Sequence, residues 1–237
     1  MAVKVRKESQ PRIRLKGANS STVNDGILLG TGDGNRTSMT FTATAEPVIV
    51  IPEGPVTNVQ LEAGSFATSY IPNNATSGTV TRSPDIASIP VSAFGYNQEA
   101  GTVVVEATAT RQLAGTMVNI CDTGSGGSIE RMQLRFYGTG IQAIFADGGS
   151  ANGSSTVNLS LSVGDTATGA WTFNSDNTLT TAANGTVGST DTSHTVPTPA
   201  ELRVGRLGTA EYLNGHIKSI RYYPRRLTDA QLQTLTS

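Results

Sequence analysis

The sequence contains a single cysteine, Cys121, and little charge: Asp, Glu, Lys and Arg make up 15% of its 237 residues. One cysteine cannot form an internal disulfide, and no Cys/His spacing matches a zinc site. The chain has no apolar run of about 18 residues that could span a membrane, and its N-terminus lacks the apolar core of a secretory signal. These absences predict synthesis and folding in the cytoplasm, without membrane insertion.

Glycine, in contrast, is abundant, with 26 residues. Gly and Asn recur at short intervals, and both favour tight turns. Between these turns, strand-like segments follow one another about every 8–12 residues, which is the spacing of an antiparallel sandwich. The composition therefore predicts an all-β fold with two packed sheets.

Two segments, 128–138 and 141–147, predict a β-hairpin because a tight glycine-containing turn joins them. Apolar and polar residues alternate in the first segment, which is typical of a strand with one buried face. Its core side is expected to carry Met132, Leu134 and Phe136, and its other side Arg131, Gln133 and Arg135.

The C-terminal region predicts one more strand and then a short helix. A β-bulge is expected at 218–219, because Ile217 and Ile220 would otherwise lie on opposite faces of the strand. The sequence Thr-Asp-Ala-Gln that follows is a capping box. It predicts a helix over about 228–236.

We divide the chain into an N-terminal docking arm with loops (1–45), a short strand pair with a linker (46–78) and the sandwich (79–237). The first 16 residues carry six Lys/Arg and one acidic residue, whereas the rest of the chain carries 11 basic and 17 acidic side chains. Apolar and basic residues alternate in the arm, so it could add a strand to a neighbouring subunit; a solvated tail is the alternative. The predicted docking residues are Lys4, Arg6, Lys7, Arg12, Arg14 and Lys16.

The sequence argues against an enzyme. Glycosidases on two-sheet sandwiches pair carboxylates, and their usual Glu-x-Asp-x-x-Glu spacing is absent, as is the Gly-x-Ser-x-Gly elbow. His194 lies in a polar segment expected to be a loop, and Asp191 nearby is too little to propose a triad. His216 is expected at the surface.

Sugar sites combine an aromatic face with amides or carboxylates that bind hydroxyl groups. Trp171 could supply that face, although it shares its parity with Phe173, which favours a core position. Asp and Asn in the loops are also ordinary turn residues, and they could hold a calcium ion without forming any calcium motif. The candidate carbohydrate-binding residues are Asp122, Asp147, Asn152, Trp171, Asn174 and Asp176.

Two pairs of motifs resemble parts of bacteriophage virion proteins. NVQLEAGSFATSYIP (58–72) with TVTRSPDIASI (79–89) resembles the junction that leads into a lectin-like domain in those proteins. LRVGR (202–206) and YLNGHIKSIRYYPRRLTDAQLQTL (212–235) resemble the end of their concanavalin A-like/laminin-G-like jelly roll. The residues that match its final turn are Tyr223, Arg225, Leu227 and Thr228.

This resemblance implies a two-sheet jelly roll and a place on a phage particle, as a tail fibre, spike or head-decoration protein. It implies a non-enzymatic structural protein, made in the host cytoplasm and displayed on the virion surface, that adheres to host-surface glycans. Its partners would be other virion proteins and further copies of itself, with no nucleic acid and no cofactor. The alternative is a purely structural decoration or baseplate subunit without a glycan ligand.

Overall fold

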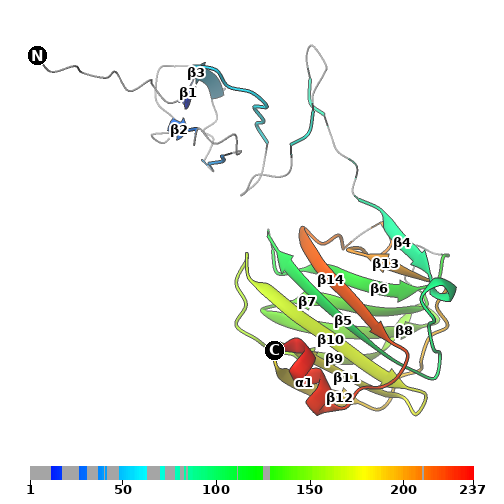
Figure 1. The fold of residues 1–237 in the computed structure, drawn as a ribbon. Coiled ribbons are helices and arrows are strands. Elements are labelled where there is room, and N and C mark those ends of the chain that lie inside the picture. The colour runs from blue at the N-terminus through cyan, green and yellow to red at the C-terminus, as the bar shows by residue number, and fades with distance from the viewer. Residues whose placement is uncertain are drawn as a thin grey trace, which may run out of the picture. The chain divides into compact units, whose positions relative to one another are not determined.

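A computed structural model of the chain describes residues 12–17, 27–30, 37–39, 41, 48–62, 70–72, 78–80, 83, 85–110, 112–124, 129–209 and 211–237. The chain divides into two compact units, Met1–Ser83 and Pro84–Ser237 (Figure 1). No helix among these described residues is long and apolar enough to cross a bilayer.

The N-terminal unit contains a small antiparallel sheet in the order β2 (Ile27–Leu29), β1 (Arg12–Gly17), β3 (Val48–Glu53). Glu53 lies opposite Arg12 and forms ion pairs with both Arg12 and Arg14, the latter at 2.9 Å. The carboxylate of β3 therefore neutralises part of the charge on β1.

Strand β1 is the part of the predicted arm that the structure describes, and residues 1–11 lie outside the described residues. Residues 12–14 of β1 pair with β2 on one side and β3 on the other within their own chain, so this part of the strand has no free edge for a neighbouring subunit. The expected strand pair at 46–78 contributes one strand, β3, among the described residues, and its partner is β1. Of the predicted docking residues, Lys16 belongs to β1 by its backbone, and Lys4, Arg6 and Lys7 lie outside the described residues.

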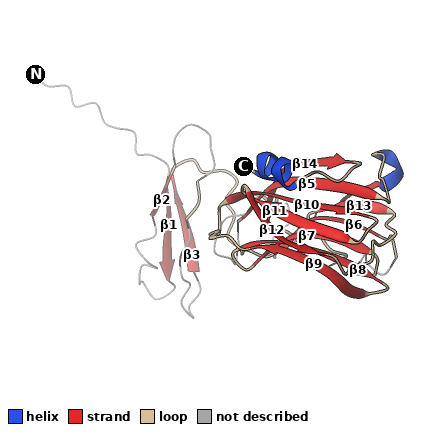
Figure 2. Cartoon of the chain, turned by 90° about the horizontal axis from the view of Figure 1, so that it is seen from below, coloured by secondary structure: helices blue, strands red, loops and turns tan. Residues whose placement is uncertain are grey.

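The C-terminal unit is a sandwich of two antiparallel sheets (Figure 2). The five-stranded sheet has the order β12 (Thr186–Asp191), β11 (Thr178–Ala183), β10 (Thr166–Asn174), β5 (Ala100–Ala109), β14 (Gly215–Tyr223). The six-stranded sheet has the order β4 (Ala87–Pro90), β13 (Glu201–Val204), β6 (Gly115–Cys121), β7 (Arg131–Tyr137), β8 (Gly140–Asp147), β9 (Ser150–Val157). A 3-10 turn, η1 (Val91–Ala93), follows β4.

The core lies between the two sheets and is built from alternate residues of each strand. Strand β5 contributes Val103 and Val105, and β10 contributes Trp171 and Phe173. Phe145 of β8 meets the last two edge-on, with ring centres 5.3 and 5.7 Å away. The β7–β8 hairpin that the sequence predicts is confirmed.

The C-terminal elements also follow the prediction. The register between β14 and β5 shifts between Ile217 and Ser219, which confirms the bulge. The helix α1 (Asp229–Thr236) begins with the expected capping box, in which Thr228 and Gln231 exchange hydrogen bonds of 3.0 and 3.3 Å.

Helix α1 packs on the outer face of the five-stranded sheet. Leu227 and Leu232 form a second apolar cluster there with Val104, Ala170 and Ala182, whose side chains point away from the main core. The corresponding outer face of the other sheet has no such helix among the described residues. Its polar side chains form the candidate site.

Candidate functional site

The outer face of the six-stranded sheet carries the alternate, polar residues of β7. The apolar residues of this strand are buried in the core, which directs its other side chains to the opposite face. This confirms the faces predicted for the strand. The outward-facing residues are Arg131, Gln133, Arg135 and Tyr137.

Neighbouring strands place further polar side chains beside them. Arg135 lies opposite Thr116 of β6 and Gln142 of β8. Gln133 lies opposite Asn119 of β6 and is 0% exposed. Hydrogen-bonding groups therefore cross three strands of this face.

The guanidinium group of Arg135 is held on three sides. Its Nε and Nη2 donate to Oε1 of Gln142 at 3.1 and 2.9 Å, and Gln142 donates in turn to Thr156 of β9 at 3.1 Å. Its central carbon lies 4.9 Å from the centre of the Tyr137 ring, within cation–π distance. The remaining nitrogen, Nη1, lies 3.6 Å from Oε2 of Glu211.

Glu211 reaches this face from the segment before β14. Its Oε2 accepts a hydrogen bond of 2.8 Å from Nε2 of the buried Gln133. Its backbone carbonyl accepts from the amide of Thr116 at 2.9 Å. Its φ is 49°, a left-handed conformation that a non-glycine residue keeps only where its surroundings enforce it.

Two further backbone hydrogen bonds fix this segment. The amide of Leu213 donates to Gly205 at 2.8 Å, and the amide of Thr110 donates to Asn214 at 2.8 Å. Gly115 permits the close approach, because a Cβ at this position would lie 2.7 Å from the Tyr212 carbonyl oxygen. The segment is therefore a rigid wall beside β7.

A cavity of about 410 Å³ lies between this wall and the ends of β6 and β7. Tyr137 is 51% exposed at its edge. We name this cavity the Arg135 cleft and define it by Gly115, Arg135, Tyr137, Glu211, Tyr212 and Asn214. An aromatic ring, a guanidinium group, a carboxylate and an amide thus border one cavity, and all four groups are ones that bind sugars.

None of the residues that define the Arg135 cleft is among the site residues predicted from the sequence. Arg135 was placed on the correct face, and Tyr137 continues the same alternation, so the aromatic end of this polar row was a detectable signal. Glu211 and Tyr212 carry no such signal. They join β7 through the path of the chain, across 70 or more residues.

Trp171 requires a correction. It is 0% exposed and packs against Phe145 and Phe173, so its ring has no face open to a ligand. Trp171 is therefore a core residue, as the alternative interpretation of the sequence predicts.

Two of the predicted site residues, Asp122 and Asp147, lie beside Glu130 on the six-stranded sheet. The amide of Asp122 donates to the Glu130 carbonyl at 2.9 Å. A hydrogen bond between the Glu130 and Asp147 side chains raises the pKa of Asp147. Glu130 also accepts from the amide of Gly148 at 2.9 Å. Within the described part of the chain, no three His, Cys, Asp or Glu side chains converge as metal ligands would.

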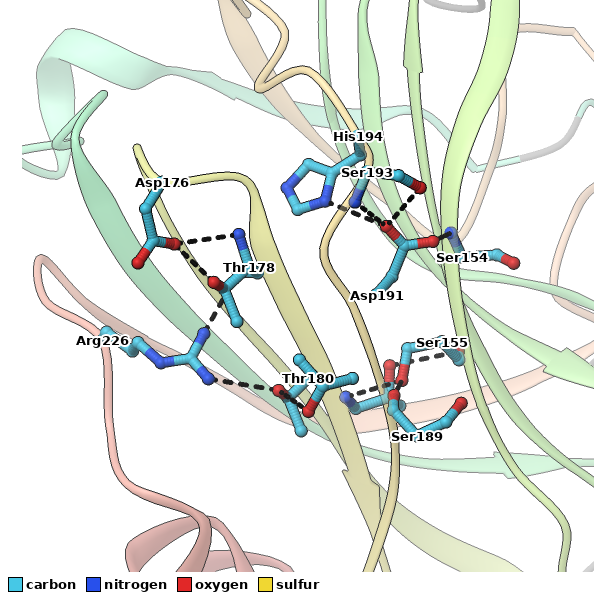
Figure 3. A network of polar contacts seen from close by, with 12 residues as sticks. Ser154, Ser155, Asp176, Thr178, Thr180, Ser189, Asp191, Ser193, His194 and Arg226 are labelled. Atoms are coloured by element: carbon cyan, nitrogen blue, oxygen red, sulfur yellow. Dashed lines mark hydrogen bonds and ion pairs between the residues drawn. The ribbon is translucent and has the colours of Figure 1, made fainter.

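The remaining predicted residues lie elsewhere. Asn152 is on β9, while Asn174 ends β10 and Asp176 lies in the turn between β10 and β11 of the other sheet. The side chain of Asp176 accepts hydrogen bonds from Thr178, which lower its pKa (Figure 3). Asn174 and Asp176 thus lie at a turn of the five-stranded sheet, whereas Asn152 belongs to a strand of the other sheet.

His194 is buried, being 1% exposed, although the sequence placed it in a polar loop. Its Nδ1 lies 3.4 Å from Oδ1 of Asp191 (Figure 3), and its ring meets Phe145 edge-on. Ser193 donates to Asp191 and not to His194. In a Ser–His–Asp triad the histidine lies between the serine hydroxyl and the carboxylate. Here the serine contacts the carboxylate directly, so the three residues do not form such a triad.

Burial lowers the pKa of His194 more than Asp191 raises it. The unfolded imidazole takes up a proton below about pH 6.5, whereas the folded one stays neutral to a lower pH. Stability that is fully present above about pH 6.5 is therefore lost as the pH falls toward the folded pKa. We expect the Tm to fall between about pH 7 and about pH 5 and the fall to be smaller in His194→Gln. An equal pH dependence in both proteins would contradict this assignment.

No protein-family model matches the chain, and no curated protein matches it in sequence. Solved structures resemble it in fold. The carbohydrate-binding module CBM40 of the Ruminococcus gnavus IT-sialidase, bound to α2,3-sialyllactose, is 18% identical with a TM-score of 0.52, covering 61% of this chain and 86% of that one. The K499G mutant of Streptococcus pneumoniae NanB sialidase is 19% identical with a TM-score of 0.52, covering 62% of this chain and 26% of that one.

These similarities define the class of fold. The chain contains an all-β, two-sheet antiparallel sandwich of the concanavalin A-like/laminin-G-like type, with one short C-terminal helix. This confirms the fold predicted from the sequence. Glycan-binding domains are among its structural neighbours.

Proposed function

We propose that this chain is a non-enzymatic surface protein of a bacteriophage particle whose sandwich adheres to host-surface glycans through the Arg135 cleft. The observation that carries the proposal is the cleft itself. It combines a half-exposed tyrosine, a fixed guanidinium group and a carboxylate on a sheet face that no described helix covers.

A sugar ring could stack against Tyr137 while its hydroxyl groups bind the polar groups beside it. Gln142 already holds Arg135 in place, so little side-chain freedom would be lost on binding. A neighbour of the same fold binds a sialylated sugar, which supports glycans as the ligand class.

The phage setting is supported by the sequence motifs at 58–89 and 202–235, which resemble virion proteins with a lectin-like domain. The strongly basic first 16 residues suit attachment to other virion proteins. Virion-surface location, assembly into oligomers and the absence of catalysis all belong to this proposal. We expect antibodies against the purified chain to label intact particles of the phage that encodes it; labelling of cell debris alone would contradict that location.

The test of adhesion is binding of the full chain to an array of bacterial surface polysaccharides, with and without calcium. We expect specific binding, recovery of the bound polysaccharide at unchanged length, and about tenfold weaker binding by Tyr137→Ala, which corresponds to about 1.4 kcal/mol. Tyr70→Ala is the matched control, because Tyr70 is an exposed tyrosine of the other unit.

Three results would overturn parts of the proposal. A folded chain that binds no glycan would favour the purely structural subunit. Equal binding by Tyr137→Ala and the unaltered protein would move the site away from the Arg135 cleft. Shortened polysaccharide would show an enzyme.

A further inference from the structure

We further propose that the Arg135 cleft selects glycans carrying an anionic group, and that the Glu211 carboxylate occupies the place of that group in the free protein. This inference rests on the proposed function and names its ligand class. It follows from the contacts of Glu211 and from the distribution of charge over the sandwich.

The sandwich is acidic overall, yet its six-stranded face is rich in arginine. Residues 84–237 carry nine Lys/Arg and twelve Asp/Glu, a net charge of −3. Arg203 of β13 lies opposite Asn119 of β6. Cys121 lies directly opposite Arg131 on this face. Three of the nine cationic side chains, Arg131, Arg135 and Arg203, therefore belong to this one sheet. Glu201 pairs with Arg203 there, and Glu211 pairs with Arg135.

Glu211 is bound as an anionic ligand would be bound. Its carboxylate receives the amide of Gln133 at 2.8 Å and lies 3.6 Å from Nη1 of Arg135. Arg131 interacts with it electrostatically from the same strand. One guanidinium group and one buried amide thus lie beside a single carboxylate, a donor set suited to carboxylate or phosphate oxygens.

The guanidinium group of Arg131 lies in the same electrostatic environment. Burial lowers the pKa of Arg131, the Glu211 carboxylate offsets part of this effect, and the Arg135 guanidinium adds to it. A second anion near Arg131 and Arg135 would stabilise both cations.

The contact between Glu211 and Arg135 is one that a ligand can displace. Its 3.6 Å separation exceeds a direct hydrogen bond, and 40% of the Glu211 side chain is exposed. The Arg135 side chain is 22% exposed, so the pair is open to solvent mainly on the Glu211 side. The Glu211 backbone is fixed, but its side chain can rotate toward solvent and leave Nη1 of Arg135 to the incoming anion.

A neutral glycan would use the same residues differently. Its hydroxyl groups would donate to the Glu211 carboxylate, so loss of that charge would weaken binding. An anionic glycan competes with the same carboxylate, so loss of the charge would strengthen binding. Replacement of one residue therefore separates the two ligand classes.

The experiment measures Kd of the full chain for three polymers: a carboxylate-bearing polysaccharide, the same polysaccharide after chemical reduction of its carboxyl groups, and a phosphate-bearing polymer. We expect the reduced form to bind at least about tenfold more weakly than its parent. Comparable binding of the phosphate polymer would identify phosphate as an equivalent source of the anion. Its failure would restrict the class to carboxylates.

Four variants then locate the effect. Arg135→Gln should weaken binding of the anionic polymer about tenfold or more, and Arg135→Lys by less, because lysine keeps the charge but loses the planar fork. Glu211→Gln should strengthen binding about threefold to tenfold. Arg221→Gln is the matched control. It removes one positive charge from an exposed position on β14 of the other sheet and should leave Kd unchanged.

The outcomes distinguish this inference from the function on which it rests. Equal binding of the parent and reduced polysaccharides, with weaker binding by Glu211→Gln, would overturn the anionic ligand and retain adhesion to a neutral glycan. If Arg135→Gln and Arg221→Gln lost equal affinity, the effect would reflect net charge alone, and the anionic-ligand inference would also be overturned. Failure of the unaltered protein to bind any of the polymers would contradict adhesion itself.

Discussion

Replacement of Trp171 with alanine is expected to lower the free energy of unfolding by about 3–5 kcal/mol. The indole is 0% exposed and lies between Phe145 and Phe173, with ring centres 5.3 and 5.7 Å away. Its removal would leave a large cavity where the two sheets meet, and strands on both sides would lose contacts.

Trp171→Phe is the matched variant. The indole Nε1 has no hydrogen-bond partner among the described residues, so phenylalanine removes volume together with an unpaired polar group. We expect a loss of only about 1–2 kcal/mol. Unfolding should be followed by circular dichroism or calorimetry, because Trp171 is the single tryptophan and its replacement removes the fluorescence signal. A cost below about 1 kcal/mol for Trp171→Ala would contradict its place in the core.

Replacement of Gly215 with alanine is expected to cost about 3 kcal/mol, at the upper end of the range for overpacked sites. A Cβ at Gly215 would lie 1.8 Å from the Thr108 carbonyl oxygen and 3.1 Å from the Ala109 Cα. Both contacts are with backbone, so the start of β14 would have to move away from β5. Asn214 precedes Gly215 and borders the Arg135 cleft, so the same variant should also weaken glycan binding.

Gly124→Ala is the control for this effect. A Cβ there would lie 3.3 Å from Oδ2 of Asp122, an atom at the end of a side chain that can move aside. We expect its free energy of unfolding and its glycan binding to match those of the unaltered protein. Similar losses in both variants would show that the close approach at Gly215 is not the cause.

Much of the fold was predictable because its signals are local. Alternation in 131–136 assigned the two faces of β7, since neighbouring residues of a strand point to opposite sides. The parity conflict between Ile217 and Ile220 located the bulge in β14, and the sequence after Leu227 contained a complete capping box. Each of these signals lies within about ten residues of chain.

The arm and His194 illustrate where such reasoning was incomplete. The alternation of apolar and basic residues predicted a strand around Arg12 and Arg14, and β1 is that strand. The pattern carried no information on its partners, which are β2 and β3 of the same chain. The polar residues around His194 likewise gave no sign that Phe145 and Gly153, more than forty residues earlier, enclose its ring.

The sequence by itself determined the all-β class, the hairpin, the bulge, the helix cap and the polar face that carries Arg135. Only the tertiary structure decided which groups meet on that face. Glu211 lies beside Arg135 because backbone hydrogen bonds to Thr116, Gly205 and Thr110 hold the segment before β14 against β6 and β7. Periodicity specifies the direction of a side chain within its own strand, whereas a site depends on contacts between segments that the chain brings together from far apart.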